Sequence, residues 1–365
     1  MERTAKKGAR RVRKSGIFRC LAAALALTAL CGCSGAENEP SAAYQNVAMG
    51  SAVSVQVYGG EAAAARAAAE DAYDAVQALD VQVLSKNASS SELYRLNHTD
   101  AAALPAKVSG ELFDVLQRTK EIYSASGGRA SLASGALTQI WGMDTNEFRV
   151  PASSEIERAL LLCSDDTVSL DEAACTVSFL PGQVLNLGSV GKGAGCDKAA
   201  AVLQEAVEAG FLRGGVVSVG GSVATVGTWT EDGEPWRVGV RDPFGGANVY
   251  FAALTVGETY ISTSGSYEKQ FTENGKTYHH ILDLTTGYPA KTDLVSVTVT
   301  ARTGLESDAL STLCFLLGEQ AAQPVLESFG AEALFVYADK TVSASAGLSG
   351  AVELLDTAYT FREAA

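Results

Sequence analysis

Histidine and proline are scarce in this sequence of 365 residues, which has three and eight of them, and basic residues are outnumbered by acidic ones. Lys and Arg total 28 against 42 Asp and Glu, a formal net charge of −14. A protein that binds duplex nucleic acid neutralises phosphates with clustered Lys and Arg, so this balance argues against nucleic-acid binding. Three histidines, with no HExxH and no paired CxxC pattern, argue against a zinc site held by His and Cys. We therefore expect any metal to be a hard cation bound by oxygen.

Hydrophobic residues make up 47% of the chain and charged residues only 19%. This composition is that of neither a disordered nor a collagen-like chain, and a chain of this length buries roughly 75% of its unfolded surface on folding. Length alone is compatible with two domains or one large one.

Residues 1–32 predict an export signal that is not part of the fold. Eight basic residues between Arg3 and Arg19 precede an apolar run over residues 20–30, which is too short to span a bilayer as a mature helix. The run ends in Leu30-Cys31-Gly32-Cys33-Ser34, which resembles a bacterial lipobox with Cys33 as the lipid acceptor. An ordinary secretory signal with incidental cysteines is the alternative.

Removal of this signal would take away eight basic residues and one acidic residue, so the mature charge would fall from −14 to −21. Two or more acyl chains on Cys33 would anchor the chain firmly. Residues 33–45, rich in Ser, Ala, Glu and Asn, predict a solvated tether. We therefore expect residues 46–362 to form a domain on the extracytoplasmic side of a bacterial cell membrane.

Four cysteines lie in this domain: Cys163, Cys175, Cys196 and Cys314. Cys163 and Cys175 could pair in an oxidising compartment, but sequence spacing does not establish the geometry of a disulfide. Free buried thiols are our expectation.

Periodicity predicts a mixture of helices and strands. Val53, Val55 and Val57 alternate along a half-buried strand over residues 51–58. Helices are expected over residues 61–84, 111–126, 193–210, 305–317 and 320–329. Further strands are expected over residues 167–170, 175–180, 215–219, 237–240, 249–254, 294–300, 333–337 and 342–345. Because helices and strands do not alternate regularly, and no linker divides residues 46–362, the fold class is α+β and not doubly wound α/β.

A glycine-rich segment, residues 186–193, precedes the helix expected over residues 193–210. It fails the P-loop pattern because Gly193 and not Ser or Thr follows Lys192, and it fails GxGxxG because Cys196 takes the place of the third glycine. Backbone amides at a helix N-terminus, together with one lysine, can nevertheless bind an anion. A plain structural turn is the alternative.

Two other segments carry groups suited to catalysis or metal binding. His279 and His280 are followed by Asp283, and a histidine oriented by a carboxylate is a candidate general base. A hydrogen-bonded histidine at a strand end is the alternative. Asp308 and Thr312 are four residues apart on an expected helix, so their oxygens share one face and suit Mg²⁺. A surface acid that stabilises a helix start is the alternative there.

Taken together, nine segments in order resemble the motifs of the ApbE-type FAD:protein FMN transferases: Met49-Gly50-Ser51; Leu84-Ser85 with Ser91-Glu92-Leu93 and Leu96-Asn97; Leu137 with Trp141-Gly142; residues 186–193 with Asp197; Val219-Gly220-Gly221; residues 238–243; residues 261–265; residues 280–289; and residues 307–312. The resemblance covers essentially all of residues 47–362. It implies a T-fold-like α+β core with a flavin cleft between two subdomains. It also implies cleavage of FAD, release of AMP, and attachment of FMN by a phosphoester to a Thr of an exported or membrane redox protein.

The resemblance also implies roles for single residues. Met49 would contact the adenine part of FAD, Asn186 and Lys192 would line the nucleotide site, and the Ile281 backbone would meet the flavin. The Ser189 carbonyl, Asp308 and Thr312, with Ser311 as a further candidate, would hold Mg²⁺, although two side chains do not distinguish Mg²⁺ from Ca²⁺. His280, helped by Asp283, would be the base for the incoming Thr hydroxyl.

Several positions depart from the family pattern. Ser131 stands in a segment that usually carries an acid, Asn186 and Ser222 replace common aspartates, and Asn87 replaces an aromatic residue. Two rival functions therefore stay open: an Mg²⁺-dependent FAD pyrophosphatase that releases FMN and AMP, and a non-catalytic flavin-binding lipoprotein.

Overall fold

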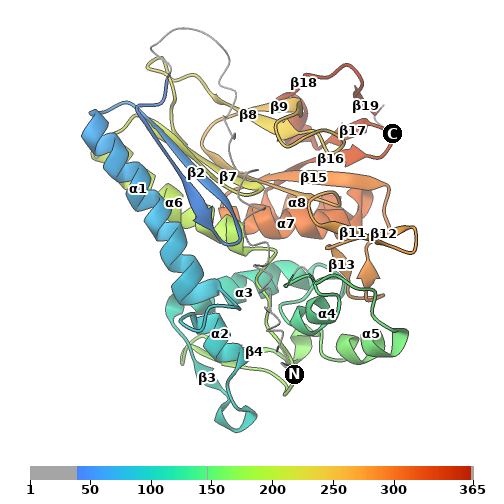
Figure 1. Cartoon of the computed structure of the whole chain (residues 1–365). Coiled ribbons are helices and arrows are strands. Elements are labelled where there is room, and N and C mark those ends of the chain that lie inside the picture. Colours follow the sequence, from blue (N-terminus) through green and yellow to red (C-terminus); the bar gives the residue numbers. More distant parts are fainter. Residues whose placement is uncertain (1–38, 146, 363–365) are drawn as a thin grey trace, which may run out of the picture.

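The computed structural model describes residues 39–145 and 147–362, and a nine-stranded sheet forms its centre (Figure 1). In spatial order the strands are β1 (Ala42–Ala48), β2 (Ser51–Tyr58), β6 (Gly214–Val219), β7 (Ser222–Gly227), β10 (Thr259–Gly265), β15 (Leu294–Ala301), β16 (Glu332–Tyr337), β17 (Thr341–Ala344) and β19 (Thr360–Phe361). Neighbouring strands are antiparallel except β17 and β19, which are parallel.

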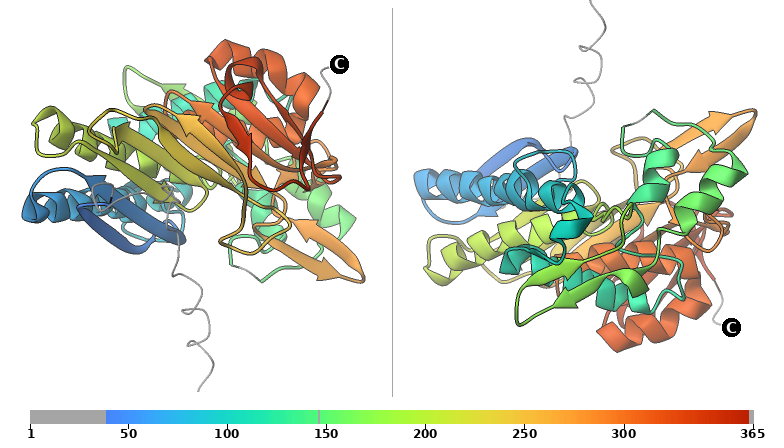
Figure 2. Two further views of the ribbon diagram at one scale, coloured as in Figure 1. Left: turned by 90° about the horizontal axis from the view of Figure 1, so that it is seen from above. Right: turned by 90° about the horizontal axis from the view of Figure 1, so that it is seen from below.

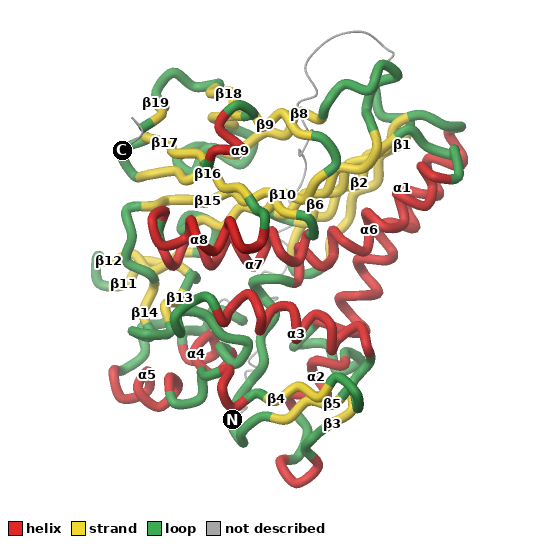
Figure 3. The backbone as a smooth tube through the Cα atoms, turned by 180° about the vertical axis from the view of Figure 1, so that it is seen from behind, coloured by secondary structure: helices red, strands yellow, loops and turns green. Residues whose placement is uncertain are grey.

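Four helices cover one face of this sheet, as the view from behind shows (Figure 3): α1 (Ala62–Ala78), α6 (Gly191–Glu208), α7 (Gly304–Leu317) and α8 (Glu319–Phe329). Alternation in β2 explains the packing, because Val53, Val55 and Val57 are all buried in one cluster with α1 and α6. The opposite face of the sheet meets a small sheet of β8 (Trp236–Arg241), β9 (Tyr250–Val256) and β18 (Val352–Leu354).

Strand β16 shows how the two layers share the sheet. Phe335 and Tyr337 pack in the cluster with α7 and α8, whereas Leu334 and Val336 pack in the cluster with β9. Because both faces of the strand are buried, its sequence is a continuous apolar run instead of an alternating one.

A second group of elements lies below the α6–α7 layer in Figure 1 and is seen from above and below in Figure 2. It comprises the π-helical turn η2 (Leu79–Leu84), α2 (Glu92–Asn97), α3 (Gly110–Ser124), α4 (Gly135–Ile140) and α5 (Ser153–Leu160), with the short strands β3 (Ala106–Lys107), β4 (Ser169–Asp171) and β5 (Thr176–Ser178). Two hairpins adjoin this group and share a hydrophobic cluster with α4 and α5: β11 (Gln270–Glu273) with β12 (Lys276–His279), which lies beside α7 in Figure 1, and β13 (Leu282–Asp283) with β14 (Tyr288–Pro289).

The predicted α+β class is confirmed, and the predicted strand over residues 51–58 coincides with β2. The expected helix over residues 61–84 is α1 followed by η2. The tether expected over residues 33–45 ends earlier than predicted, because residues 42–45 belong to β1, which pairs with β2. Residues 1–32 and Cys33 lie outside the described residues, and no helix within the described part of the chain is long and apolar enough to cross a membrane.

The four cysteines of the domain are free thiols, as expected. Cys163, Cys196 and Cys314 are buried, whereas Cys175 is partly exposed.

Candidate active site

A cavity of about 560 Å³ opens between the α6–α7 layer and the lower group of elements. All the site residues predicted from the sequence line it except Ser311 and Asp283: Met49, Asn186, Ser189, Lys192, His280, Ile281, Asp308 and Thr312. They come from the β1–β2 turn, the segment that leads into α6, the segment after β12, and helix α7. The fold therefore brings together motifs that are up to 263 positions apart in the printed numbering.

Two helix N-termini meet at the base of the cavity. Gly193 and Gly304 touch so closely that a Cβ at Gly193 would lie 1.9 Å from the Gly304 carbonyl oxygen. The Gly193 amide, one of the first amides of α6 that have no acceptor within the helix, donates to Asp308 Oδ2 at 2.9 Å.

Asp197 of α6 fastens the two helices together. Its carboxylate accepts hydrogen bonds from the amides of Gly304 (2.6 Å) and Leu305 (2.9 Å), at the N-terminus of α7. Burial, together with the neighbouring Glu306, raises the pKa of Asp197 to about 6, against the two amides, which lower it. The position of Asp308 relative to Lys192 therefore depends on this contact between helices.

Charges at the base of the cavity favour a cation. Burial raises the pKa of Asp308, against Lys192 and the Gly193 amide, which lower it. Burial alone would lower the pKa of Lys192, but the carboxylates of Asp308 and Glu268 raise it above its ordinary value. The carboxylate of Asp308, the hydroxyl of Thr312 one turn further along α7 and the oxygens of Ser189 all line the cavity, and hard oxygens suit Mg²⁺. No cluster of three or more His, Cys, Asp and Glu with the spacing of a metal site occurs among the described residues.

Ser311 differs from the other predicted ligands, because it is fully buried behind the cavity wall. Its hydroxyl contacts the Ser264 hydroxyl at 2.7 Å, and Ser264 in turn contacts Thr312 Oγ1 at 3.0 Å. Ser311 therefore supports Thr312 through Ser264 and does not itself face the cavity.

His280 lines the cavity with an unsatisfied ring nitrogen, since its buried Nδ1 has no hydrogen-bond partner among the described residues. Burial, with smaller effects from Lys192, His279 and Lys269, lowers the pKa of His280 to about 4. The imidazole is therefore neutral at pH 7 and able to accept a proton. An orphaned buried nitrogen in a cavity indicates a position for a ligand group.

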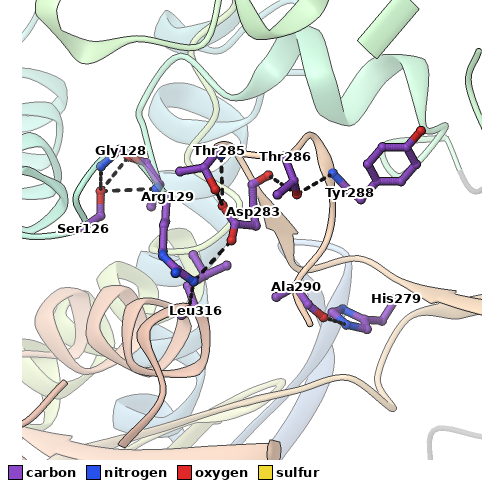
Figure 4. Close-up of polar contacts among 11 residues, drawn as sticks. Ser126, Gly128, Arg129, His279, Asp283, Thr285, Thr286, Tyr288, Ala290 and Leu316 are labelled. Atoms are coloured by element: carbon purple, nitrogen blue, oxygen red, sulfur yellow. Dashed lines mark hydrogen bonds and ion pairs between the residues drawn. The ribbon is translucent and has the colours of Figure 1, made fainter. Parts of the chain in front are cut away.

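The predicted help of Asp283 to His280 is wrong in this geometry. The Asp283 carboxylate binds Arg129 (3.3 Å) and the amide and hydroxyl of Thr285 (2.9 and 2.6 Å), as Figure 4 shows. The reason is local: the turn between β13 and β14 directs Asp283 toward its own backbone and toward α7, where Arg129 also binds the Leu316 carbonyl. Of the two histidines, His279 is the one bound at a strand end, to the Ala290 carbonyl at 3.1 Å.

Met49 occupies a conformation that is rare for its residue type. Met49 and Gly50 form the two-residue turn between β1 and β2, with φ of 53° and 66°. Such a turn favours Asn or Gly at both positions. The Met49 amide is held by Asp80 Oδ2 at 2.7 Å, and its sulfur packs against Gly195 of α6. The structure thus keeps a thioether at the cavity wall in a strained turn.

The sequence profile of the ApbE family matches residues 49–335. The chain belongs to the ApbE family. Among proteins similar to it, the FAD:protein FMN transferase of Treponema pallidum is 33% identical over 348 residues, which cover 90% of this chain and 94% of that protein. The FAD:protein FMN transferase of Klebsiella pneumoniae is 31% identical over 320 residues, 87% of this chain and 95% of that protein.

Solved structures of ApbE proteins agree in fold. The crystal structure of the ApbE protein of Thermotoga maritima superposes with a TM-score of 0.75 at 27% identity, covering 85% of this chain and 98% of that one. The flavin transferase ApbE of Vibrio cholerae has a TM-score of 0.69 at 22% identity, covering 85% and 98%. The resemblance inferred from the nine segments is therefore confirmed.

The departures from the ApbE pattern have specific places in this fold. The Ser131 hydroxyl donates to Asp165 at 2.6 Å, an acid from another segment that does not itself line the cavity. Ser222 is buried and accepts a hydrogen bond from Ser262 at 2.9 Å, outside the cavity lining. Asn87 and Asn186 do line the cavity.

Sequence reasoning missed several residues of this ApbE cavity. Lys86, Asp144, Tyr123 and Glu268 all line it. Tyr123 of α3 binds the hydroxyl of Ser189, and Glu268 accepts a hydrogen bond from Arg241 at 3.1 Å. No sequence motif predicts these residues, because each contacts a partner that is distant in the sequence.

Proposed function

We propose that this chain is an FAD:protein FMN transferase that cleaves FAD to AMP and attaches FMN by a phosphoester to a Thr of an acceptor protein. The observation that carries the proposal is the cavity, which gathers Lys192, the oxygens of Ser189, Asp308 and Thr312, and the free Nδ1 of His280. The names of the curated relatives support the reaction class.

The residues of the chain suit phosphoryl transfer, which depends chiefly on positioning and charge neutralisation. Ser189, Asp308 and Thr312 would hold Mg²⁺, which supplies Lewis-acid neutralisation of a pyrophosphate when bound. Lys192, whose pKa is raised by its acidic neighbours, would contribute a second positive charge to the phosphate oxygens.

His280 would act on the acceptor. Its neutral imidazole would accept the proton of the Thr hydroxyl while the oxygen bonds to the phosphorus of the FMN half. The bond from that phosphorus to the bridging oxygen would break, and this oxygen would leave as part of AMP. Water in place of the hydroxyl would yield free FMN, so hydrolysis is the competing reaction of the same site.

We further propose that the enzyme is a lipoprotein held through Cys33 on the extracytoplasmic side of a bacterial membrane, where an exported or membrane redox protein would be its acceptor. The basic and apolar segments of residues 1–32 and the lipobox-like residues 30–34 support this placement.

The reaction can be tested with the purified mature chain, residues 34–365, incubated with FAD and Mg²⁺, with and without a Thr-containing acceptor peptide. AMP is followed by chromatography and the peptide by mass spectrometry. A mass gain of one FMN with an equal amount of AMP is the expected result. AMP in equal amounts with and without the peptide, and no change in peptide mass, would indicate a pyrophosphatase; bound flavin without AMP would indicate a flavin carrier.

A further inference from the structure

Four side chains form a closed polar network on the cavity wall: Lys86, Thr138, Asp144 and Asn186. The Lys86 ammonium donates to Asp144 Oδ1 and to Asn186 Oδ1, the latter at 3.2 Å. Thr138 Oγ1 lies 3.1 Å from Asp144 Oδ2 and accepts from Asn186 Nδ2 at 3.3 Å. The network thus joins the segment after η2, helix α4 with the loop after it, and the segment before α6.

The network leaves two N–H donors over on the cavity wall, besides unused lone pairs of the Asp144 carboxylate. An ammonium has three N–H groups, and Lys86 uses two of them; an amide has two, and Asn186 uses one. Asn186 Oδ1 already accepts twice, from Lys86 and from the Gly188 amide at 3.0 Å. Only 17% of the Lys86 side chain is exposed, so its remaining N–H has little access to water outside the cavity. Donors in such a place need an acceptor.

The ion pair also determines what kind of acceptor fits. Because Asp144 neutralises Lys86, this wall offers directed N–H groups without a net positive charge. A ring carbonyl, a ring nitrogen or a sugar or phosphoryl oxygen satisfies such donors, and nucleotides carry all of these. The two bonds to Asp144 and Asn186 fix the ammonium before a ligand arrives, which reduces the entropy lost on binding.

We propose that Lys86 is a nucleotide-recognition residue of this cavity, which donates its remaining N–H to an acceptor atom of bound FAD while Asp144 and Asn186 hold it in place. This inference rests on the proposed function. It gives Asn186 a purpose as well: an amide at this position accepts from Lys86 and donates to Thr138, whereas a carboxylate cannot donate.

The test is the affinity for FAD of the full-length chain, measured by calorimetry, for the wild type, Lys86→Met and the double variant Lys86→Met/Asp144→Asn. The double variant removes both charges, so it leaves no unpaired buried carboxylate to unfold the protein. We expect the Kd for FAD to rise about 10- to 100-fold in both variants, because each loses one hydrogen bond from a charged donor to the ligand. The KM for FAD should rise equally, with kcat at saturating FAD unchanged.

A matched control is the pair Lys198 and Glu111, whose Nζ and Oε1 lie 2.5 Å apart outside the cavity lining. Lys198→Met/Glu111→Gln should bind FAD like the wild type. Parallel titrations with AMP and FMN identify which half of the dinucleotide Lys86 contacts, since only that half should lose affinity.

A purely structural network would give the opposite result: a folded double variant with a Kd within twofold of the wild type overturns the inference. Absence of FAD binding by the wild type overturns it together with the proposed function. FAD binding that depends on Lys86, without AMP release or peptide modification, overturns only the proposed reaction.

Discussion

Burial affects the pKa of His280 in this cavity more than its charged neighbours do. His280 sits beside Lys192 and Lys269 with an unpaired Nδ1, and its pKa falls to about 4. His279, one residue away, is bound to a backbone carbonyl. The sequence predicted a histidine oriented by Asp283 as a general base, but the turn geometry directs Asp283 to Thr285 and Arg129 instead.

The pH dependence of FMN transfer should reflect the lowered pKa of the buried His280. Because the pKa of His280 in the folded state lies below its ordinary value of 6.5, the imidazole stays neutral down to about pH 4. The acid limb of kcat/KM for the acceptor should therefore lie near pH 4 and not near 6.5. The same shift means that this group lowers the stability of the fold as pH falls from 6.5 toward 4, since the unfolded state then binds the proton first.

His280→Gln should lower kcat about 10²- to 10⁴-fold and remove that limb, the usual contribution of a general base. His279→Gln, which alters a ring outside the cavity lining, is the control and should retain both the rate and the pH profile. An unchanged rate in His280→Gln would assign the base elsewhere.

The dependence of turnover on Mg²⁺ should require the carboxylate of Asp308. Asp308→Asn keeps the shape of the side chain but removes the charge, so we expect turnover with Mg²⁺ to fall about 100-fold or more, the scale of several kcal/mol of charge stabilisation. The rate is measured against Mg²⁺ concentration, with Asp166→Asn at an exposed position as the control. Full activity of Asp308→Asn at ordinary Mg²⁺ concentrations would exclude Asp308 as a ligand.

Elements with strong periodicity were predicted well from the sequence, and elements made of small polar residues were not. The valines of β2 and the apolar run of β16 indicate strands directly. Strand β10 was not among the predicted strands, because polar Ser262 and Ser264 take positions that are buried in the fold. These serines are buried because they bond to Ser307 and Ser311 of α7, a pairing that no local pattern reveals.

The crossing of α6 and α7 should tolerate no side chain at its centre. Gly193→Ala would place a Cβ 1.9 Å from the Gly304 carbonyl oxygen and 2.7 Å from Asp308 Cβ, so the helices must separate. We expect unfolding free energy to fall by about 3 kcal/mol or more, as for severe overpacking against backbone. Gly191→Ala, with open space around its Cβ, should change it by about 1 kcal/mol or less. Denaturant titrations of both variants measure the difference; equal stabilities would contradict the close packing.

The same crossing should give a distinctive pH dependence through Asp197. Its pKa in the folded state, about 6, lies above the ordinary 3.8, so the folded state binds the extra proton and this group contributes less stability as pH rises from 4 to 6. In Asp197→Asn the side chain does not titrate, so the variant does not lose this stability as pH rises. The unfolding free energy of the variant relative to the wild type should therefore rise with pH across this window, by about 2 kcal/mol. Denaturant unfolding at pH 4, 5 and 6 checks it, and a difference that is flat or falls with pH would contradict the burial of this carboxylate.

At the scale of the whole molecule, the sequence predicted the cavity residues that belong to motifs, but not the other residues that line the cavity. Lys192 and Asp308 were predicted because each lies in a motif with its own chemistry. Lys86 and Asp144 were not, because they meet across 58 positions and each alone has the pattern of a solvent-facing residue. Ser131 likewise meets its partner, Asp165, across 34 positions. Motifs report chemistry, whereas contacts between distant segments appear only when the chain folds.

The proposed lipid anchor on Cys33 can be tested together with the charge of the mature chain. With the proposed signal removed, the charge of −21 would repel anionic lipids and would add nothing to the proposed lipid anchor on Cys33. If the proposed lipid on Cys33 is the membrane contact, Cys33→Ser should move the enzyme from the membrane to the soluble extracytoplasmic fraction. Fractionation of cells that express either form, followed by assay of AMP release from FAD, measures both location and activity. Cys163→Ser is the control and should stay with the membrane. Release with unchanged activity would show that the lipid sets location only, whereas retention of Cys33→Ser after a high-salt wash would contradict the lipobox and indicate that another segment holds the protein.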